Sequence, residues 1–138
     1  MDLPEIGNMS STHSANPIAC SAGLAVLNEI EGRQLVQESH RKGLILHSKL
    51  TEIQLEFPQL IDRVLGKGMI AALILKDKDG GANARAASAI AEECMRNGLL
   101  VVHTGRESIK IGPPLVIDDD ALLEGIEVLK QAIKKVQG

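Results

Sequence analysis

Residues 64–75, Val-Leu-Gly-Lys-Gly-Met-Ile-Ala-Ala-Leu-Ile-Leu, decide how this chain folds. Two apolar runs, Val64-Leu65 and 69–75, stand on either side of Gly66-Lys67-Gly68. Short apolar runs separated by glycines are typical of strands, so we expect extended structure over residues 62–76 with a bend at the glycines. The full spacing of a Walker phosphate loop is absent, which favours the bend over a nucleotide site.

Helical periodicity precedes this extended segment. Pro17 suits the first turn of a helix, and apolar residues follow it at spacings of three to four until Glu31-Gly32 interrupts the pattern. A second helix is predicted from about Arg33 to Phe57, where Pro58 ends it. Its apolar stripe consists of Leu46, Leu50, Ile53 and Phe57.

Three further elements follow a charged turn at residues 76–81. An alanine-rich helix is predicted over 84–97, two strands forming a hairpin over 99–102 and 108–111, and a last helix after Asp118-Asp119-Asp120, whose negative charge suits a helix start. The apolar face of this helix is expected to hold Leu122, Leu123, Ile126, Leu129 and Ile133. This order of elements predicts an α+β fold, a small antiparallel sheet covered by helices on one side.

Composition narrows the function classes. The chain has 138 residues, one phenylalanine, no tryptophan or tyrosine, and a net charge of −3, so a single-stranded nucleic-acid platform is disfavoured. The first residues resemble no secretory signal, and no apolar run approaches the roughly 20 residues that cross a bilayer. Cys20 and Cys94 form no C-x-x-C pair, which favours reduced thiols. We expect a cytoplasmic protein with no membrane or nucleic-acid partner.

Residues 10–17, Ser-Ser-Thr-His-Ser-Ala-Asn-Pro, form a polar stretch at the entrance of the first helix. Hydroxyl groups next to the free N–H groups of a helix start can hold a phosphate. The same residue types are the usual helix caps, so the residues alone favour a plain cap.

Other clusters favour structural roles. His40 and His47 are seven residues apart without a nearby cysteine or carboxylate, which makes a poor zinc site. Asp118 to Asp120 lack the alternating spacing and the glycine of a calcium loop. We therefore expect no metal site.

Several segments together resemble the class III (ω-type) aminotransferases, the 4-aminobutyrate aminotransferase-like pyridoxal-phosphate enzymes of fold type I. Residues 11–20, Ser-Thr-His-Ser-Ala-Asn-Pro-Ile-Ala-Cys, are similar to a signature of that family. So are residues 66–73, 97–100 and 110–115, in the family's order. The resemblance covers essentially the whole chain. It implies that this chain is the C-terminal part, the small domain, of such an enzyme.

The resemblance also implies a division of the chain. Residues 1–16 would be an arm from the large domain that carries the cofactor-phosphate motif, residues 17–57 linking helices, and residues 58–138 the small domain. A complete family member is much longer, and its Schiff-base lysine lies before the segment matched by Thr12. No lysine precedes Thr12, so we expect a fragment that is inactive alone and has no catalytic residue of its own.

The resemblance assigns candidate contacts to four residues. Thr12, and next Ser11, would donate to the phosphate of pyridoxal 5'-phosphate across a dimer interface. His13 would form a wall of the substrate pocket. Lys110 stands where several members carry an arginine that binds the substrate carboxylate, although a lysine lacks the planar fork. A water-exposed lysine on an edge strand is the alternative, and Arg106 in the neighbouring turn could serve instead.

The sequence therefore leads to two candidate functions. The first is a segment of a transaminase that moves an amino group from an amino acid or ω-amino donor to an oxo acid, partnered by its large domain and a second subunit in a homo-oligomer. The alternative is a noncatalytic α+β regulatory or assembly module derived from that fold.

Overall fold

The computed structural model describes residues 15–103 and 105–137, which form two compact units divided after Leu35. The first unit contains helix α1 (Pro17–Gly32), which confirms the predicted helix. Asn16 caps α1, and Arg33 pairs with Glu29 at 2.8 Å near its end. No residue of α1 is buried, so its apolar positions stay accessible.

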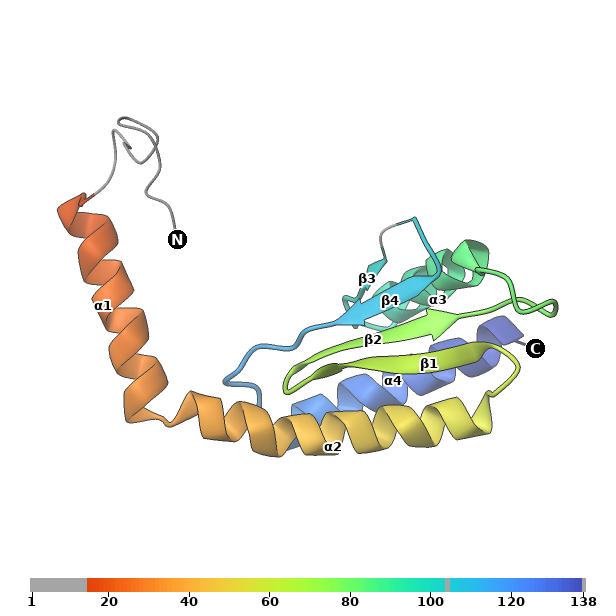
Figure 1. The fold of residues 1–138 in the computed structure, drawn as a ribbon, viewed down its shortest axis with the longest axis horizontal. Coiled ribbons are helices and arrows are strands. Elements are labelled where there is room, and N and C mark those ends of the chain that lie inside the picture. Colours follow the sequence, from red (N-terminus) through yellow and green to blue (C-terminus); the bar gives the residue numbers. More distant parts are fainter. Residues whose placement is uncertain (1–14, 104, 138) are drawn as a thin grey trace, which may run out of the picture. The chain divides into compact units, whose positions relative to one another are not determined.

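The second unit joins helices to one antiparallel sheet (Figure 1). The helices are α2 (Leu35–Glu56), α3 (Ala84–Arg96) and α4 (Asp119–Gln137). The strands are β1 (Ile61–Lys67), β2 (Ile70–Leu75), β3 (Val102–His103) and β4 (Ser108–Ile111), in the spatial order β1-β2-β4-β3. The predicted α+β fold is confirmed, and the chain turns at Gly68-Met69, so Gly66 and Lys67 belong to β1 rather than to the expected bend.

One expected strand is shorter than predicted. The sequence predicts a strand over residues 99–102, whereas β3 contains only Val102 of this run, together with the following His103. Leu99 instead lies against α4, where its Cδ1 would be 3.3 Å from a Cβ placed on Gly125. Leu99 is partly buried against the core in this position, and removal of its apolar surface from water stabilises the arrangement.

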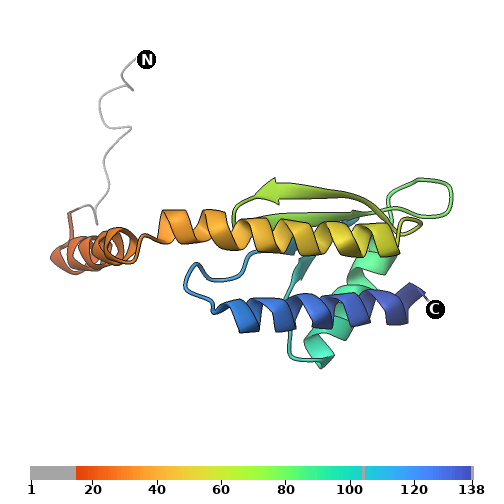
Figure 2. The same cartoon turned by 90° about the horizontal axis from the view of Figure 1, so that it is seen from below.

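The core lies between the sheet and the helices, and Figure 2 shows α2 and α4 running side by side. Alternate residues of β2, namely Ala71, Leu73 and Leu75, are at most 1% exposed and meet the helices. The predicted stripe of α2 is buried. Of the face predicted for the last helix, Leu123 is an exception at 41% exposed, because its neighbours Leu122 and Ile126 already point into the core.

Helix α2 approaches the β1–β2 turn through two glycines. A Cβ placed on Gly43 would lie 2.5 Å from the Cα of Gly68, which is closer than real Cβ contacts. Gly68 itself has a φ of 58°, a left-handed conformation that favours glycine. The backbones of α2 and the turn therefore meet where neither residue can carry a side chain.

A buried carboxylate links α3 to α4. Glu93 is 7% exposed; Lys135 Nζ donates to its Oε1 at 2.8 Å, and Asn97 Nδ2 donates to the same oxygen at 2.9 Å. These donors, Lys135 first, hold the pKa of Glu93 below its usual value. The carboxylate therefore stabilises the fold in its charged form.

We predict that Gly43→Ala destabilises the second unit, because the new Cβ forces α2 away from the turn. Overpacking of this kind costs about 1–3 kcal/mol, measured as the free energy of unfolding in urea. Gly125→Ala is the matched control in α4, where the neighbour is the flexible end of Leu99. It should change stability by at most about 1 kcal/mol, in the stabilising direction expected from helix propensity. Equal losses for both variants would contradict the close approach at Gly68.

A second prediction concerns acid stability. The pKa of Glu93 is lower in the folded chain than the ordinary value of 4.5, so its contribution is full above that value and is lost as the pH falls through the folded pKa. We expect Glu93→Gln to be less stable than the parent near pH 7 and to lose less stability on acidification. Urea midpoints at several pH values measure this. Glu92→Gln, which removes a more exposed carboxylate beside Arg96, should leave the acid slope nearly unchanged.

Candidate functional site

Helices pack against one face of the sheet (Figures 1 and 2), and Lys110 is an exposed residue of strand β4. Strand β4 alternates, with Ile109 fully buried toward the helices and Lys110 exposed on the other side. Because successive side chains of a strand point to opposite faces, the buried core fixes the direction of Lys110. The open face is therefore the place where this side chain can meet a ligand.

Strand register places Lys110 within a row of apolar residues. Ala72 of β2 lies opposite it on one side and Val102 of β3 on the other, and Leu65 of β1 continues the row beyond Ala72. Strand β4 is an interior strand of the sheet, so the edge position in the alternative is wrong, whereas the solvent exposure that it expected for Lys110 is present. Within the described residues Lys110 forms no ion pair, which leaves its ammonium group available to an anion.

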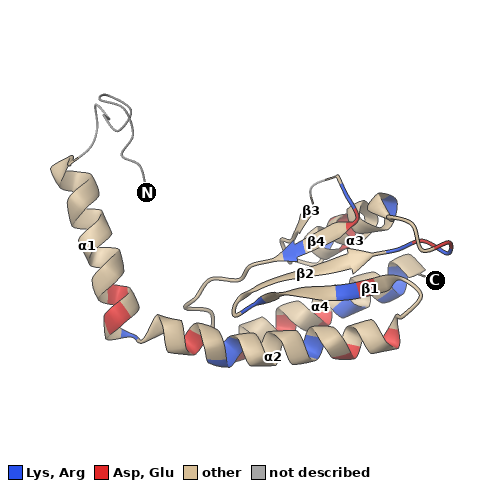
Figure 3. Ribbon diagram, viewed as in Figure 1, with Lys and Arg blue, Asp and Glu red and all other residues tan. Residues whose placement is uncertain are grey.

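Strand β1 carries two further basic residues (Figure 3), and the strand register places them on the same face as Lys110. Arg63, Leu65 and Lys67 follow one another at a spacing of two along β1, so they lie on the same face of the strand, and all three are exposed. Asp62 accepts from Arg63 Nε at 2.8 Å, so Arg63 is already paired. Our reading of the sequence did not place these residues beside Lys110, although their spacing of two along a strand was the available signal.

The described residues at the start of α1 are already occupied by a cap. Asn16 Oδ1 accepts from the Ile18 N–H at 2.9 Å, Pro17 has no N–H, and the Cys20 N–H donates to the Asn16 carbonyl. The cap predicted as one alternative is therefore present, with Asn16 as the capping residue. The expected phosphate contacts Ser11 and Thr12, and the pocket residue His13, lie outside the described residues.

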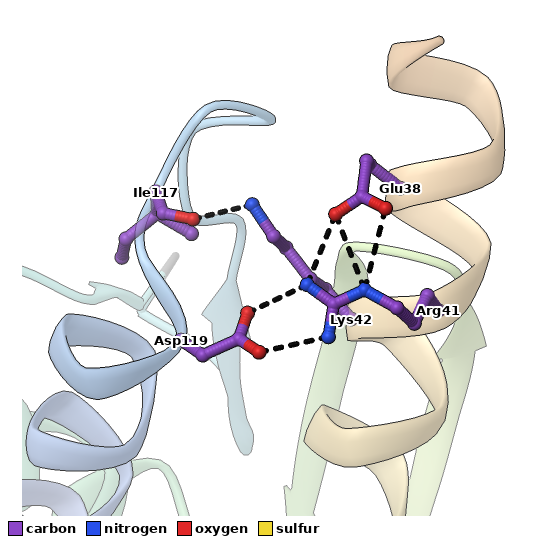
Figure 4. Close-up of polar contacts among 5 residues, drawn as sticks. All are labelled: Glu38, Arg41, Lys42, Ile117 and Asp119. Carbon is purple, nitrogen blue, oxygen red and sulfur yellow. Dashed lines mark hydrogen bonds and ion pairs between the residues drawn. The ribbon is translucent and has the colours of Figure 1, made fainter. Parts of the chain in front are cut away.

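A polar clamp, defined here as Glu38, Arg41, Lys42, Ile117 and Asp119, joins α2 to the start of α4 (Figure 4). The guanidinium of Arg41 donates to both carboxylate oxygens of Asp119 at 2.8 Å and also to Glu38. Arg41 holds the pKa values of Asp119 and Glu38 below their usual range. Beside it, the buried Lys42 donates from Nζ to the Ile117 carbonyl at 2.5 Å.

The clamp fixes the connection that follows Lys110. The chain leaves β4 at Ile111, passes Pro113-Pro114, turns through the bond from the Ile117 N–H to the Pro114 carbonyl, and enters α4 at Asp119. Sequence reasoning assigned the acidic residues here to a helix start and missed Arg41 as their partner. The two residues are 78 positions apart, so no local pattern indicates the pair.

The remaining candidates stay apart from this face. Arg106 lies 3.7 Å from Glu107 with its side chain 77% exposed, as expected for a solvated turn residue. No group of three metal-binding side chains occurs in residues 15–103 and 105–137. The two cysteines are free, Cys20 exposed and Cys94 buried, and burial raises the pKa of Cys94 to about 11. Over the same described ranges, none of the helices has the length and apolar character to cross a membrane.

Residues 1–133 match the aminotransferase class-III family. The acetylornithine aminotransferase of Synechocystis is 36% identical over 132 residues, which are 96% of this chain and 30% of that protein. A probable 4-aminobutyrate aminotransferase of Bacillus subtilis is also 36% identical, over 97% of this chain and 31% of its own length. Among solved structures, the acetylornithine aminotransferase of Elizabethkingia anophelis superposes with a TM-score of 0.81 at 27% identity, over 97% of this chain and 32% of that one.

These matches run through nearly all of the chain, in sequence and in structure, and agree with the motifs at residues 11–20, 66–73 and 110–115. The chain spans about 30% of the length of the curated relatives it matches. It belongs to the class-III aminotransferase family and corresponds to a part of such an enzyme.

Proposed function

We propose that this chain is the small-domain part of a pyridoxal-phosphate-dependent transaminase and that Lys110 binds the carboxylate of its amino donor or oxo-acid acceptor. The observation that carries the proposal is the position of Lys110, exposed and without an ion-pair partner among the described residues, between Ala72 and Val102 on the open face. A single ammonium group offers charge without a planar fork. The ammonium group of Lys110 therefore suits a carboxylate whose orientation is fixed by other groups.

The cofactor requires residues beyond those described. The Ile18 N–H is bonded to Asn16 and Pro17 has no N–H, so few donors at the start of α1 remain for a phosphate. We propose that the hydroxyl groups of Thr12 and Ser11 donate to the phosphate instead, across a subunit interface, with His13 beside the substrate. When bound, pyridoxal phosphate supplies the electron sink for the chemistry.

A second polypeptide, or a further part of this one, must supply the Schiff-base lysine. The first lysine of the chain is Lys42, whose ammonium group is buried and held by the Ile117 carbonyl. We propose a large domain and a second subunit as partners, because relatives of this chain are about three times longer. The chain alone is then inactive, and the cytoplasm is its expected compartment.

The alternative, a noncatalytic assembly module, is favoured by one observation. Helix α1 carries four large exposed apolar side chains and buries none within its unit. These are Ile18, Leu24, Val26 and Leu27. Such an apolar surface suits association with another protein, with or without catalysis. Recovery of activity with a large domain would support the enzyme, whereas stable association without activity would support the module.

We predict that Lys110→Met weakens carboxylate binding. The assay uses a chimaera in which this chain replaces the corresponding part of the Synechocystis relative, with the KM for an oxo acid as the measurement. Loss of one charge-assisted hydrogen bond should raise KM by about 10- to 100-fold, and Lys110→Arg should retain or improve binding. Lys67→Met, which removes a cation from the same face, is the control. An unchanged KM in Lys110→Met would exclude Lys110 as the carboxylate ligand.

The cofactor contact generates a separate prediction. In the same chimaera, Thr12→Ala should weaken pyridoxal-phosphate binding by roughly 10-fold, because one donor to a charged phosphate is lost. Titration of the apoprotein, followed by cofactor absorbance, measures the affinity. Ser21→Ala, at an exposed position of α1, should bind the cofactor like the parent. Equal affinity of Thr12→Ala and the parent would rule out the proposed phosphate contact.

A further inference from the structure

Part of the open sheet face, on strands β1 and β2, is apolar and exposed. The strand register places Leu65 opposite Ala72 and Lys67 opposite Ile70, and residues two apart along a strand lie on the same face. These four residues are therefore neighbours, and we call them the hairpin patch. Leu65 is 47% exposed and Ile70 is 72% exposed, so apolar surface of the patch faces water.

Basic side chains lie within and beside the hairpin patch. Lys67 belongs to it, and Lys110 of β4 lies opposite Ala72 on the other side. Arg63 lies further along β1 and is already paired with Asp62. Within residues 15–103 and 105–137, Lys67 forms no ion pair. A carboxylate placed beside Lys67 therefore gains an electrostatic attraction, whereas a basic group is repelled.

The apolar surface and the free charge together define the chemistry of the partner. A small anion would satisfy Lys67 but would leave Leu65 and Ile70 in water. A purely apolar segment would cover these two residues but would remove water from the ammonium group without replacing it. A polypeptide segment that carries apolar side chains next to an aspartate or a glutamate does both, and packing of a second layer on a sheet face is a common arrangement in folded proteins.

The size of the patch indicates where this segment comes from. Two strands about 4.8 Å apart, with residues about 3.4 Å apart along each, give the four residues an area of roughly 100 Å². A stable interface between separate proteins buries roughly 800 Å² on each partner. A separate protein bound to this patch alone would dissociate readily, whereas a segment of the same enzyme is held nearby at a high effective concentration. The chain spans 30% of the length of its Synechocystis relative, so most of such an enzyme lies outside it.

We propose that the hairpin patch is the docking surface for a polypeptide segment that presents apolar side chains beside a carboxylate, and that this segment belongs to the part of the enzyme outside this chain. The inference rests on the proposed function, because it takes the chain to be one part of a transaminase. The segment covers the β1 and β2 side of the open face. Lys110, on the β4 side, stays free for the substrate carboxylate.

Thiol labelling tests whether the patch is covered. Ile70→Cys is prepared in the isolated chain and in the chimaera with the Synechocystis relative, both with Cys20→Ser because Cys20 is exposed. The rate of maleimide labelling at position 70, measured by peptide mass spectrometry, should be at least about 10-fold lower in the chimaera, since labelling there requires local opening. Leu55→Cys on α2, at a position that is 75% exposed, is the matched control and should react equally fast in both proteins.

A second variant protects the test against damage to the patch itself. Ala72→Cys keeps Leu65 and Ile70 and gives the same comparison if Ile70→Cys weakens docking. Equal labelling rates in the chain and in the chimaera at both positions would overturn the proposal. Slow labelling of the dilute isolated chain would also overturn it, because the chain or a second copy of it would then cover the patch.

Charge reversal tests for the carboxylate. In the Ile70→Cys chimaera, Lys67→Glu should restore most of the labelling rate, since two carboxylates would then face each other. Lys78→Glu, in the exposed turn after β2, should leave the protection unchanged. Unchanged protection in Lys67→Glu would exclude a carboxylate as the partner of Lys67.

The labelling uses neither substrate nor cofactor, so its outcome is separate from the KM measurement on Lys110. An active chimaera with an unprotected patch would contradict the docking surface alone. A protected patch together with an unchanged KM in Lys110→Met would contradict the proposed substrate contact alone.

Discussion

The burial of one face of a four-stranded sheet is the constraint on which the rest of this structure depends. Leu73, Ala71 and Ile109 point to the helices and are almost fully buried, and this burial is the main source of stability for a core with a single aromatic residue. Because a strand alternates, the same packing directs Lys110 to the opposite face. The position of the candidate ligand group is thus a consequence of core packing.

A close backbone contact and charged hydrogen bonds also hold α2 in place, in addition to apolar packing. Gly43 and Gly68 allow α2 to lie directly on the β1–β2 turn. Directly before Gly43 on the same helix, Arg41 and Lys42 hold the start of α4 through Asp119 and the Ile117 carbonyl. Residues 41–43 of α2 are therefore in contact with both the β1–β2 turn and the start of α4.

The surfaces that we propose as functional are exposed and suit contact with another molecule or with another part of the protein. The open sheet face carries Lys67 and Lys110, which form no ion pair with the residues that the structure describes, and α1 carries exposed leucine, valine and isoleucine. The start of α1 is satisfied by Asn16 and offers little to a phosphate. Each observation agrees with a chain that spans about 30% of the length of the relative it matches. We propose that catalysis depends on groups that the chain does not contain.

The sequence by itself determined the family, the order of the elements and most of the core. Local signals carried this information, such as the stripe from Leu46 to Phe57 and the glycines between β1 and β2. Only the tertiary structure decided the exposure of Leu123, the short β3, the interior position of β4 and the pairing of Arg41 with Asp119. These features depend on contacts between residues far apart in the chain, and neither periodicity nor residue type specifies which distant partner a side chain will meet.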